Sequence, residues 1–218
     1  MKLLISPAKK MRAEDFLPPR TQPPLLEKSA QLLDYVRGLS LPQLKRLLAC
    51  NESLAQEAFE NFRAMELGRG TTPALLAYDG IQYKYMAPGV FTQAQLEYVG
   101  EHLRILSGFY GVLRPFDGVS PYRLEMQARL EVKGDGGQKD SKNLYGFWGD
   151  KIYRELAGDG PAVILNLASK EYSRAVEPYL RTGDRFVTCV FGTLKDGKVR
   201  VKATEAKMAR GEMVRFLA

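Results

Sequence analysis

The stretch LRILSGFYGVLRPFDGVSPYRLEM, residues 103–126, most strongly shapes the interpretation of this chain. Gly108 and Gly111 permit a tight bend or a close approach to a ligand, because glycine has no Cβ atom. A planar guanidinium group suits the binding of phosphate or carboxylate, and the stretch carries three of them. They belong to Arg104, Arg114 and Arg123. The stretch therefore indicates a binding surface rather than a linker.

The composition is typical of a globular protein, and the net charge favours an anionic partner. The chain has 218 residues, 45% of them hydrophobic, which is enough for one large domain or two small ones. Neither a repeat nor a convincing linker is visible, so we expect a single domain over residues 1–218, with two subdomains as the lesser alternative. The formal net charge of +7 favours nucleic acid, a phosphorylated ligand or an acidic surface.

Cysteine usage and the N-terminus indicate a cytoplasmic protein. Cys50 and Cys189 lie far apart without CxxC spacing, which argues against a disulfide framework or a thiolate metal cluster. The apolar run Leu3 to Ile5 is too short for a signal peptide or a membrane span.

The N-terminal half predicts one strand followed by helices. Apolar residues predict a strand at residues 2–5, and prolines between residues 18 and 24 exclude a helix there. Capping boxes, Ser40 with Gln43 and Thr92 with Gln95, mark two helix starts. Asn51 is the expected N-cap of a third helix. The expected helices are residues 27–37, 41–49, 52–65 and 93–103, with a turn-rich region at 78–90.

The C-terminal half alternates strands and helices, which predicts an α/β fold with a mixed sheet and helical cover. Expected strands are residues 124–132 and 162–167, and a hairpin pairs 185–194 with 198–203 around Asp196-Gly197. Residues 133–143 read as an exposed loop. Expected helices are residues 144–157, 170–180 and 205–218, the last with Thr204 as N-cap.

Three segments outside the opening stretch offer further cations. Lys9 and Lys10 follow the first strand, at the end where open α/β sheets bind ligands. Lys170 begins a helix that would attract anions, and Lys207 and Arg210 share one arc of the final helix. Each has a structural alternative, namely a solvated loop, an N-cap at Ser169 and a solvated helix face.

Signals for catalysis or metal binding are thin. His102 is the only histidine, and no HExxH, clustered Asp, GxGxxG or Walker pattern occurs. His102 therefore reads as a structural residue at a helix end. Glu125 and Glu171 are candidates for a carboxylate pair brought together by folding, although ion pairs with neighbouring cations are the commoner explanation of such mixtures.

Several long strings resemble the bacterial YaaA family of peroxide-stress proteins. They are SPAKK (6–10), LRILSGFYGVLRPFD (103–117), PYRLEM (121–126), YGFWGDKI (145–152), NLASKEY (166–172) and KMARGEM (207–213). The resemblance implies a cytoplasmic protein that protects DNA and other targets during oxidative stress, that is linked to lower free intracellular iron, and that binds duplex DNA.

The family resemblance also implies a fold. It implies a mixed α/β single domain with an electropositive cleft and a helix-hairpin-helix element, which we place on residues 93–113 with the hairpin at 107–111. The glycines there follow a Gly-x-x-Gly pattern instead of the usual Gly-x-Gly. Family members continue beyond KMARGEM, so we expect a chain shortened at its C-terminus, inside an apparent helix.

The leading hypothesis is a DNA-binding stress protein without catalysis, cofactor or metal. It binds the phosphate backbone of double-stranded DNA with weak sequence specificity, because phosphate contacts carry no base information. The candidate DNA-binding residues are Lys9, Lys10, Arg104, Gly108, Gly111, Arg114, Arg123, Lys170, Lys207 and Arg210.

Two alternatives remain. One is an enzyme acting on a phosphorylated or nucleotide ligand in the same cleft, with Glu125 or Glu171 as general acid or base. The other is an iron-handling protein that uses carboxylates and His102. An enclosed pocket where Glu and Lys converge favours the enzyme, and an open basic groove of duplex width favours DNA.

Overall fold

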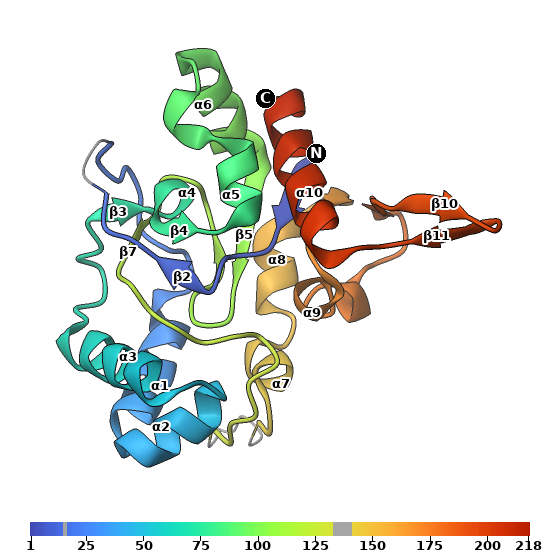
Figure 1. The fold of residues 1–218 in the computed structure, drawn as a ribbon. Coiled ribbons are helices and arrows are strands. Elements are labelled where there is room, and N and C mark those ends of the chain that lie inside the picture. Colours follow the sequence, from blue (N-terminus) through green and yellow to red (C-terminus); the bar gives the residue numbers. More distant parts are fainter. Residues whose placement is uncertain (15–16, 133–140) are drawn as a thin grey trace.

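A five-stranded mixed sheet forms the centre of the protein, which is described by a computed structural model over residues 1–14, 17–132 and 141–218 (Figure 1). The strand order is β6-β5-β1-β8-β9, in which β6 is antiparallel to β5 and the other pairs are parallel. The strands are β1 (Lys2–Ile5), β5 (Leu103–Ser107), β6 (Gly111–Leu113), β8 (Val163–Asn166) and β9 (Arg185–Thr188). The predicted mixed α/β architecture is confirmed.

The middle strand β1 is apolar because it is covered on both faces. Leu3, Leu4 and Ile5 are completely buried, as expected for a strand between two parallel neighbours. Leu3 pairs in register with Leu103 of β5 and Leu165 of β8. The predicted strand at residues 2–5 is therefore correct and occupies the centre of the sheet.

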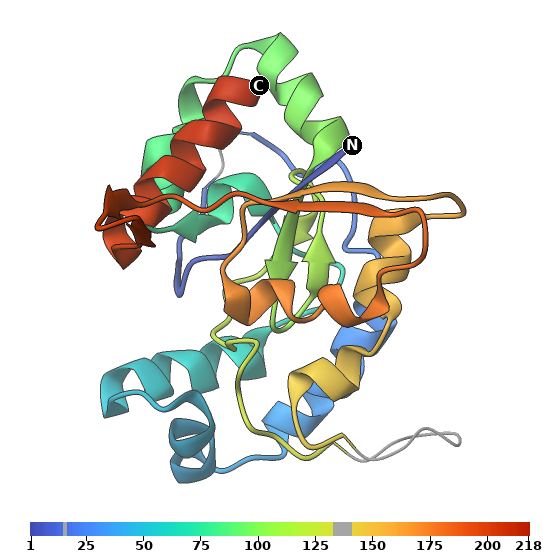
Figure 2. The same cartoon turned by 90° about the vertical axis from the view of Figure 1, so that its right-hand side faces the viewer.

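Three helices gather at one end of the molecule (Figures 1 and 2). They are α1 (Leu26–Arg37), α2 (Leu41–Leu48) and α3 (Glu52–Ala64). The Ser40 backbone N–H donates to Gln43 Oε1 at 2.8 Å, and the Leu54 backbone N–H donates to Asn51 Oδ1 at 3.0 Å. These local hydrogen bonds explain why the sequence located the helix starts correctly.

Three other helices lie at the opposite end, namely α5 (Ile81–Met86), α6 (Gln93–His102) and α10 (Ala203–Leu217) (Figures 1 and 2). Helix α10 packs along α5. A Cβ atom on Gly211 would lie 2.1 Å from the carbonyl oxygen of Gln82, so the contact requires glycine at this position. The turn-rich interpretation of residues 78–90 missed α5, and the N-cap of α10 is Lys202 rather than Thr204.

Several expected long elements are broken into short ones. The helix expected at 144–157 divides at Gly149, whose φ is 52°, into α7 (Leu144–Trp148) and α8 (Lys151–Ala157). The helix expected at 170–180 becomes α9 (Lys170–Ser173) and the 3-10 helix η2 (Glu177–Tyr179). The remaining elements are β2 (Lys10–Met11), β3 (Thr72–Pro73), α4 (Ala74–Ala77), β4 (Tyr78–Asp79), η1 (Pro88–Val90) and β7 (Gly118–Val119).

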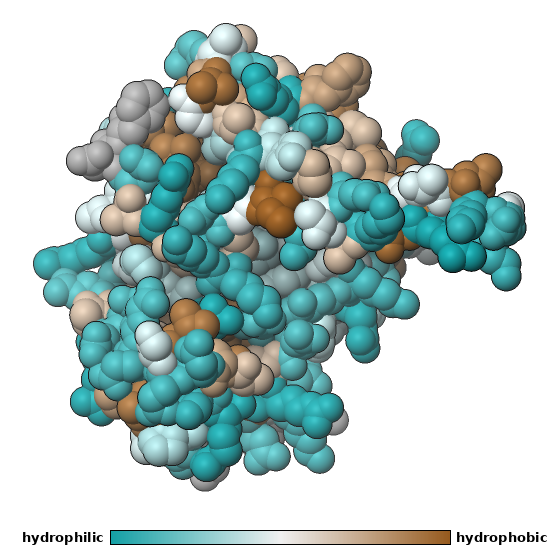
Figure 3. Space-filling model, viewed as in Figure 1, coloured by the Kyte–Doolittle hydropathy of each residue, from teal (hydrophilic) through white to brown (hydrophobic). Residues whose placement is uncertain are grey.

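The C-terminal hairpin is half correct. Strands β10 (Thr193–Lys195) and β11 (Lys198–Arg200) pair around Asp196-Gly197 as predicted, and they project from the body (Figures 1 and 3). The first half of the expected strand, however, is β9 of the main sheet. The strand expected at 124–132 is absent from these described residues, where Val132 makes only an isolated bridge to Ser141. Most of the expected loop, residues 133–140, lies outside the described residues.

The placement of a helix-hairpin-helix on residues 93–113 is wrong. Helix α6 is followed directly by the antiparallel strands β5 and β6, so the second helix of such a motif does not form there. The turn between the strands is buried, and the N–H groups of Phe109 and Tyr110 donate to Ser107 Oγ at 3.2 and 2.7 Å. The hairpin is part of the protein core.

Aromatic packing explains the burial of this hairpin. The ring of Phe109 packs against Phe62, Tyr110 and Tyr122, with centroid separations of 5.6, 4.8 and 5.3 Å. The indole N–H of the buried Trp148 donates to the Gly108 carbonyl at 3.1 Å. Residues that looked suited to a ligand are therefore used to join the sheet to its helical cover.

Candidate functional site

The main candidate site lies beyond the carboxyl ends of β1 and β8. Strand β1 has β5 on one side and β8 on the other, so the chain crosses over β1 between these strands and creates a switch point in the sheet. Open α/β sheets bind ligands at such points. The Ser169 N–H, just after β8, donates to Ser6 Oγ, just after β1, at 2.8 Å. This hydrogen bond joins the loop after β1 to the loop after β8.

A cavity of about 400 Å³ opens at this position. That volume lies within the range of small-molecule sites, about 300 to 1,000 Å³. Five chain segments supply its walls: Ser6 to Lys10, Asp79 to Tyr83, Tyr122 to Glu125, the start of α9, and α10. The site is therefore assembled from segments that lie far apart in the sequence.

Basic side chains predominate in the lining. Five basic and three acidic residues line the cavity, which leaves an excess of two positive charges. The basic residues are Lys9, Lys10, Arg123, Lys207 and Arg210, and the acidic ones are Asp79, Glu125 and Glu171. Half of the ten candidate residues from the sequence thus meet in one place.

Three of the five cations have an acidic neighbour. Lys9 Nζ lies 2.8 Å from Glu125 Oε1, and Arg123 Nη2 lies 3.9 Å from the same oxygen. Lys10 Nζ lies 3.3 Å from Asp79 Oδ2. The side chains of Lys9 and Lys10 are 65% and 77% exposed, so solvent screens these pairs and they stabilise the fold little.

The other cations are unpaired within the described part of the chain. Neither Lys207 nor Arg210 has an acidic partner there, and Nε of both Arg123 and Arg210 is buried without a hydrogen-bond acceptor. Burial lowers the pKa of Arg210. Because a buried donor without an acceptor destabilises a fold, these two N–H groups are the donors in the cavity lining that a ligand would satisfy.

Glu171 is the titratable carboxyl group of most interest. Burial raises its pKa, and the negative charge of Glu125 acts in the same direction, while Lys9 opposes it. Its Oε1 accepts a long hydrogen bond, 3.4 Å, from the Gln127 N–H. A carboxyl group with a raised pKa in a cavity is a candidate for a functional role.

Buried tyrosines and a glutamine fix the inner wall. The Tyr83 hydroxyl and Gln82 Nε2 both donate to the Ser6 carbonyl at 3.1 Å. The Tyr122 hydroxyl contacts the Tyr78 hydroxyl at 2.9 Å and Ser107 Oγ at 2.7 Å. Burial raises the pKa of all three tyrosines, so each stays neutral. Sequence reasoning missed Asp79, Gln82 and Tyr83 because it treated their segment as a turn.

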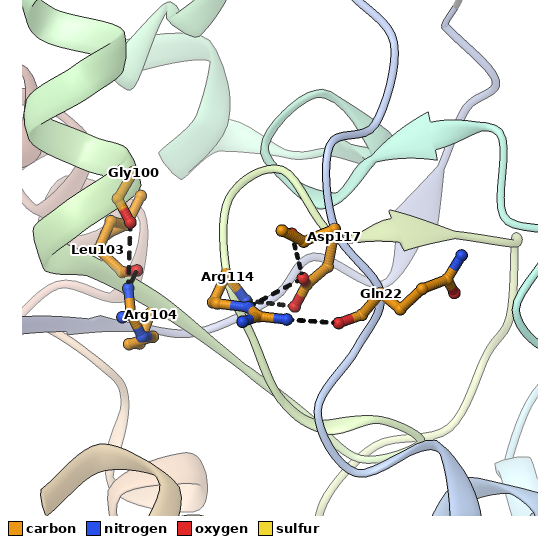
Figure 4. A network of polar contacts seen from close by, with 7 residues as sticks. Gln22, Gly100, Leu103, Arg104, Arg114 and Asp117 are labelled. Atoms are coloured by element: carbon orange, nitrogen blue, oxygen red, sulfur yellow. Dashed lines mark hydrogen bonds and ion pairs between the residues drawn. The ribbon is translucent and has the colours of Figure 1, made fainter. Parts of the chain in front are cut away.

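Arg104 and Arg114 do not line the cavity. Their hydrogen bonds go to other groups of the protein (Figure 4). Arg104 Nη1 donates to the carbonyls of Leu103 at 2.7 Å and Gly100 at 3.4 Å. Arg114 donates through Nε to Asp117 Oδ1 at 3.1 Å and through Nη2 to the Gln22 carbonyl. Both guanidinium groups therefore donate hydrogen bonds to other groups of the same chain.

The two glycines of the opening stretch also serve packing. Both are buried, and a Cβ atom on Gly108 would lie 2.3 Å from the Leu124 carbonyl oxygen. Gly111 has a φ of +73° and lies against Trp148. Lys170, in contrast, is exposed and lines a neighbouring hollow together with Arg210.

His102 ends α6, as predicted, and its Nδ1 lies 3.0 Å from the Met1 carbonyl oxygen. Across residues 1–14, 17–132 and 141–218, three or more His, Cys, Asp or Glu side chains nowhere come together in a way that would hold a metal ion. In the same ranges, every helix is too short or too polar to cross a lipid bilayer.

The fold and the cavity define a mixed α/β protein with a cation-lined site at the carboxyl ends of parallel strands. A family model described as "Peroxide stress protein YaaA" matches residues 1–218, and the chain belongs to this family. The resemblance seen in the sequence strings is confirmed over the whole chain.

Curated relatives share about half of their residues with this chain. It is 53% identical over 219 residues to a UPF0246 protein of Desulfitobacterium hafniense and 52% identical over 219 residues to one of Lactiplantibacillus plantarum. A UPF0246 protein of Pediococcus pentosaceus is 51% identical over 219 residues. The alignments cover 100% of this chain and 84%, 86% and 84% of the respective relatives.

Proposed function

We propose that this protein binds duplex DNA across the mouth of the cavity. The observation that carries the proposal is the convergence of cations from three separate segments, the loop after β1, the segment after β7 and helix α10. Lys9, Lys10 and Lys207 are exposed, and solvent screens the pairs of Lys9 with Glu125 and Lys10 with Asp79, so phosphates can compete for these ammonium groups. Lys170 is exposed in the adjoining hollow.

The dimensions of the cavity limit how DNA would bind. A space of about 400 Å³ does not enclose a duplex, whose major groove alone is about 12 Å wide. The convergence of Glu125 and Lys9 inside it is the feature expected of the enzyme alternative, so the DNA proposal rests on the exposed cations around the opening. The duplex would therefore lie over the opening, with backbone phosphates against the exposed lysines and the arginines beneath. Contacts of this kind give affinity with weak sequence preference.

The proposed interface differs from the one expected from sequence. Arg104 and Arg114 are left out because their guanidinium groups already bond to carbonyl and carboxylate groups of the protein. Gly108 and Gly111 are left out because both are buried. The interface keeps Lys9, Lys10, Arg123, Lys170, Lys207 and Arg210.

The proposed cellular role is protection of DNA in the cytoplasm during peroxide stress, together with a lower level of free iron. This part rests on membership of the peroxide-stress family. It predicts that cells lacking the gene contain more chelatable iron after peroxide treatment and accumulate more DNA strand breaks. Equal iron and equal breakage with and without the gene would contradict it.

Titration of labelled duplex DNA at several salt concentrations tests the binding proposal. Counterion release makes log affinity fall with log salt by about 0.9 for each phosphate contacted. Lys10→Ala combined with Lys207→Ala should weaken binding to unrelated duplexes equally and reduce that slope by about 2.

The matched control combines Arg46→Ala on α2 with Lys142→Ala just before α7. Both residues are exposed, and their segments lie at the end of the molecule opposite α10 (Figures 1 and 2). The control removes the same charge, so it should change affinity less than the mouth variant. Salt-independent affinity, or equal losses in both double variants, would contradict DNA binding at this mouth.

A further inference from the structure

We propose that the cavity beneath the DNA-facing mouth is a separate binding site for a small phosphomonoester, whose phosphate group is held between Arg123 and Arg210. This inference goes beyond DNA binding, because the ligand enters the cavity instead of lying across it. Arg123 and Arg210 come from different parts of the chain, the segment after β7 and helix α10, and both line the same space.

The unused donors of these arginines carry the inference. Each guanidinium group offers five N–H donors and accepts nothing. Nε of Arg123 and Nε of Arg210 are both buried without an acceptor, and they are the two buried side-chain polar atoms in this state among the described residues. Phosphate oxygens accept bidentate bonds from guanidinium groups and would satisfy both.

A third cation extends the phosphate site toward the mouth. Lys207 lies three residues before Arg210 on α10, so both side chains lie on one face of the helix. Lys207 is exposed and lacks an acidic partner in the described ranges. Its ammonium group is free to draw an anion toward the half-buried arginines.

The net charge of the residues that line the cavity favours a ligand with a single phosphate group. Five cations and three carboxylates leave two positive charges in excess. A phosphomonoester carries a charge of about −1.5 to −2 near pH 7, which balances that excess. A di- or triphosphate would add negative charge close to Glu125 and Glu171.

The remaining lining suits an uncharged organic group on the same ligand. Tyr83, Tyr122 and Tyr172 are buried and contribute aromatic surface, and Leu124 and Ile81 contribute aliphatic surface. Ligand pockets combine such apolar walls with a few placed polar groups. Glu171 also lines the cavity, where its carboxyl group can bond to a hydroxyl of the ligand. A nucleoside monophosphate or a molecule of similar size fits this description.

Calorimetric titration of the whole chain with inorganic phosphate, a nucleoside 5′-monophosphate and the parent nucleoside tests the site. We expect the monophosphate to bind at least about tenfold more tightly than the nucleoside, because its phosphate adds charge-assisted hydrogen bonds to the arginines. Equal affinity for the two would overturn the proposal.

The decisive variant is Arg210→Gln, with Arg215→Gln as its matched control on the same helix. Arg215 is exposed and lies outside the cavity lining. Arg210→Gln should weaken the monophosphate about tenfold or more, and Arg215→Gln should leave it unchanged. Unliganded Arg210→Gln should unfold at the same temperature as the wild type or higher, because it removes an unsatisfied buried group. Unchanged monophosphate binding in Arg210→Gln would overturn the proposal.

Two sources of the same phosphate group must be separated. The terminal phosphate of a DNA end has the chemistry of a free monoester. The two sources are distinguished by measuring how well a short duplex competes with the bound monophosphate, once with 5′-phosphates on the duplex and once with 5′-hydroxyls. Equal competition by the two duplexes supports a small-molecule site, whereas about tenfold better competition by the phosphorylated duplex would overturn it in favour of DNA ends.

The failure of this proposal is distinguishable from failure of DNA binding. Lys10→Ala with Lys207→Ala lowers DNA affinity if the mouth binds DNA, whereas Arg210→Gln tests monophosphate binding in the absence of any DNA. Monophosphate binding that persists in a protein with no salt-dependent DNA affinity would remove the DNA proposal and leave the cavity site standing.

Discussion

The hairpin of β5 and β6 and the cavity beside β1 both carry arginines that the sequence marks as binding residues, and they differ in what those arginines contact. In the hairpin region, Arg104 and Arg114 donate to carbonyl oxygens and to the buried carboxylate of Asp117 (Figure 4). In the cavity, Arg123 and Arg210 each keep a buried N–H without an acceptor. In the hairpin region the arginine N–H groups bond to acceptors of the protein. In the cavity one N–H group of each arginine has no acceptor among the described residues.

This difference shows what a basic residue says about function. All four arginines look alike in sequence, and three of them lie within residues 103–126. Donors with internal acceptors stabilise the fold, while buried donors without acceptors lower stability unless a ligand is bound. A buried N–H without an acceptor is therefore the property that separates the cavity arginines from those of the hairpin region, and the predictions below test that separation.

The largest expected effect comes from Trp148→Ala. Trp148 is fully buried, and its indole donates to the Gly108 carbonyl. Its removal should lower the free energy of unfolding by about 3–5 kcal/mol, measured by chemical denaturation. Monophosphate affinity of the folded fraction should hardly change. A stable Trp148→Ala protein would show that the hairpin is not part of the core.

The next largest loss of stability is expected for Gly211→Ala, because the added methyl group would push α10 away from α5. The new methyl group would meet the Gln82 carbonyl and destabilise the protein by about 1–3 kcal/mol. Because α10 carries Lys207 and Arg210, monophosphate affinity should fall as well. Gly160→Ala is the control, since nothing lies within 4 Å of its Cβ position. Full stability and full affinity in Gly211→Ala would contradict this close packing.

Arg114→Ala should have a smaller effect, and on stability alone. It removes hydrogen bonds to Asp117 and Gln22, while Asp117 keeps the Thr21 hydroxyl and the backbone N–H of residue 114 as donors. The expected loss is about 1 kcal/mol of unfolding free energy. DNA affinity, measured at one salt concentration, should stay close to that of the wild type. A large loss of DNA affinity would return the hairpin region to the interface.

The smallest effect is a pH dependence that arises from Glu171. Burial raises its folded-state pKa above the usual 4.5, so the folded protein holds this proton more tightly than the unfolded chain. The free energy of unfolding therefore falls as pH rises from about 4.5 through the folded-state pKa. Glu171→Gln should be more stable than the wild type at neutral pH, and the difference should vanish below pH 4.5. Lys9→Met removes the opposing positive charge, so its free energy of unfolding should depend on pH more strongly than that of the wild type.

Local patterns were enough to predict a large part of the fold. The central strand β1 and the helices α1, α2, α3 and α6 were located within about one or two residues. Apolar runs and capping boxes act over a few residues, so they can be recognised in sequence. Helix α5 was missed because six residues carry too little periodicity, and the strand expected at 124–132 was wrong because buried apolar residues also occur in irregular segments.

The candidate site was predicted in part. Lys9, Lys10, Arg123, Lys207 and Arg210 were named from sequence and line one cavity. Arg104, Arg114, Gly108 and Gly111 were named on the same grounds and are buried or bonded within the hairpin region. Glu125 and Glu171 were named as a pair and line the same cavity, whereas Asp79, Gln82 and Tyr83 gave no recognisable signal.

The sequence by itself determined the family, the mixed α/β class, the central strand and the stock of cations, because these depend on residue identity and short-range pattern. The tertiary structure alone decided which cations have partners. Asp117 is buried beside Arg114, whereas no described carboxylate reaches Arg210. Burial and pairing depend on segments far apart in the chain, and the same guanidinium group therefore donates to protein acceptors in one region and keeps a buried N–H without an acceptor in the other.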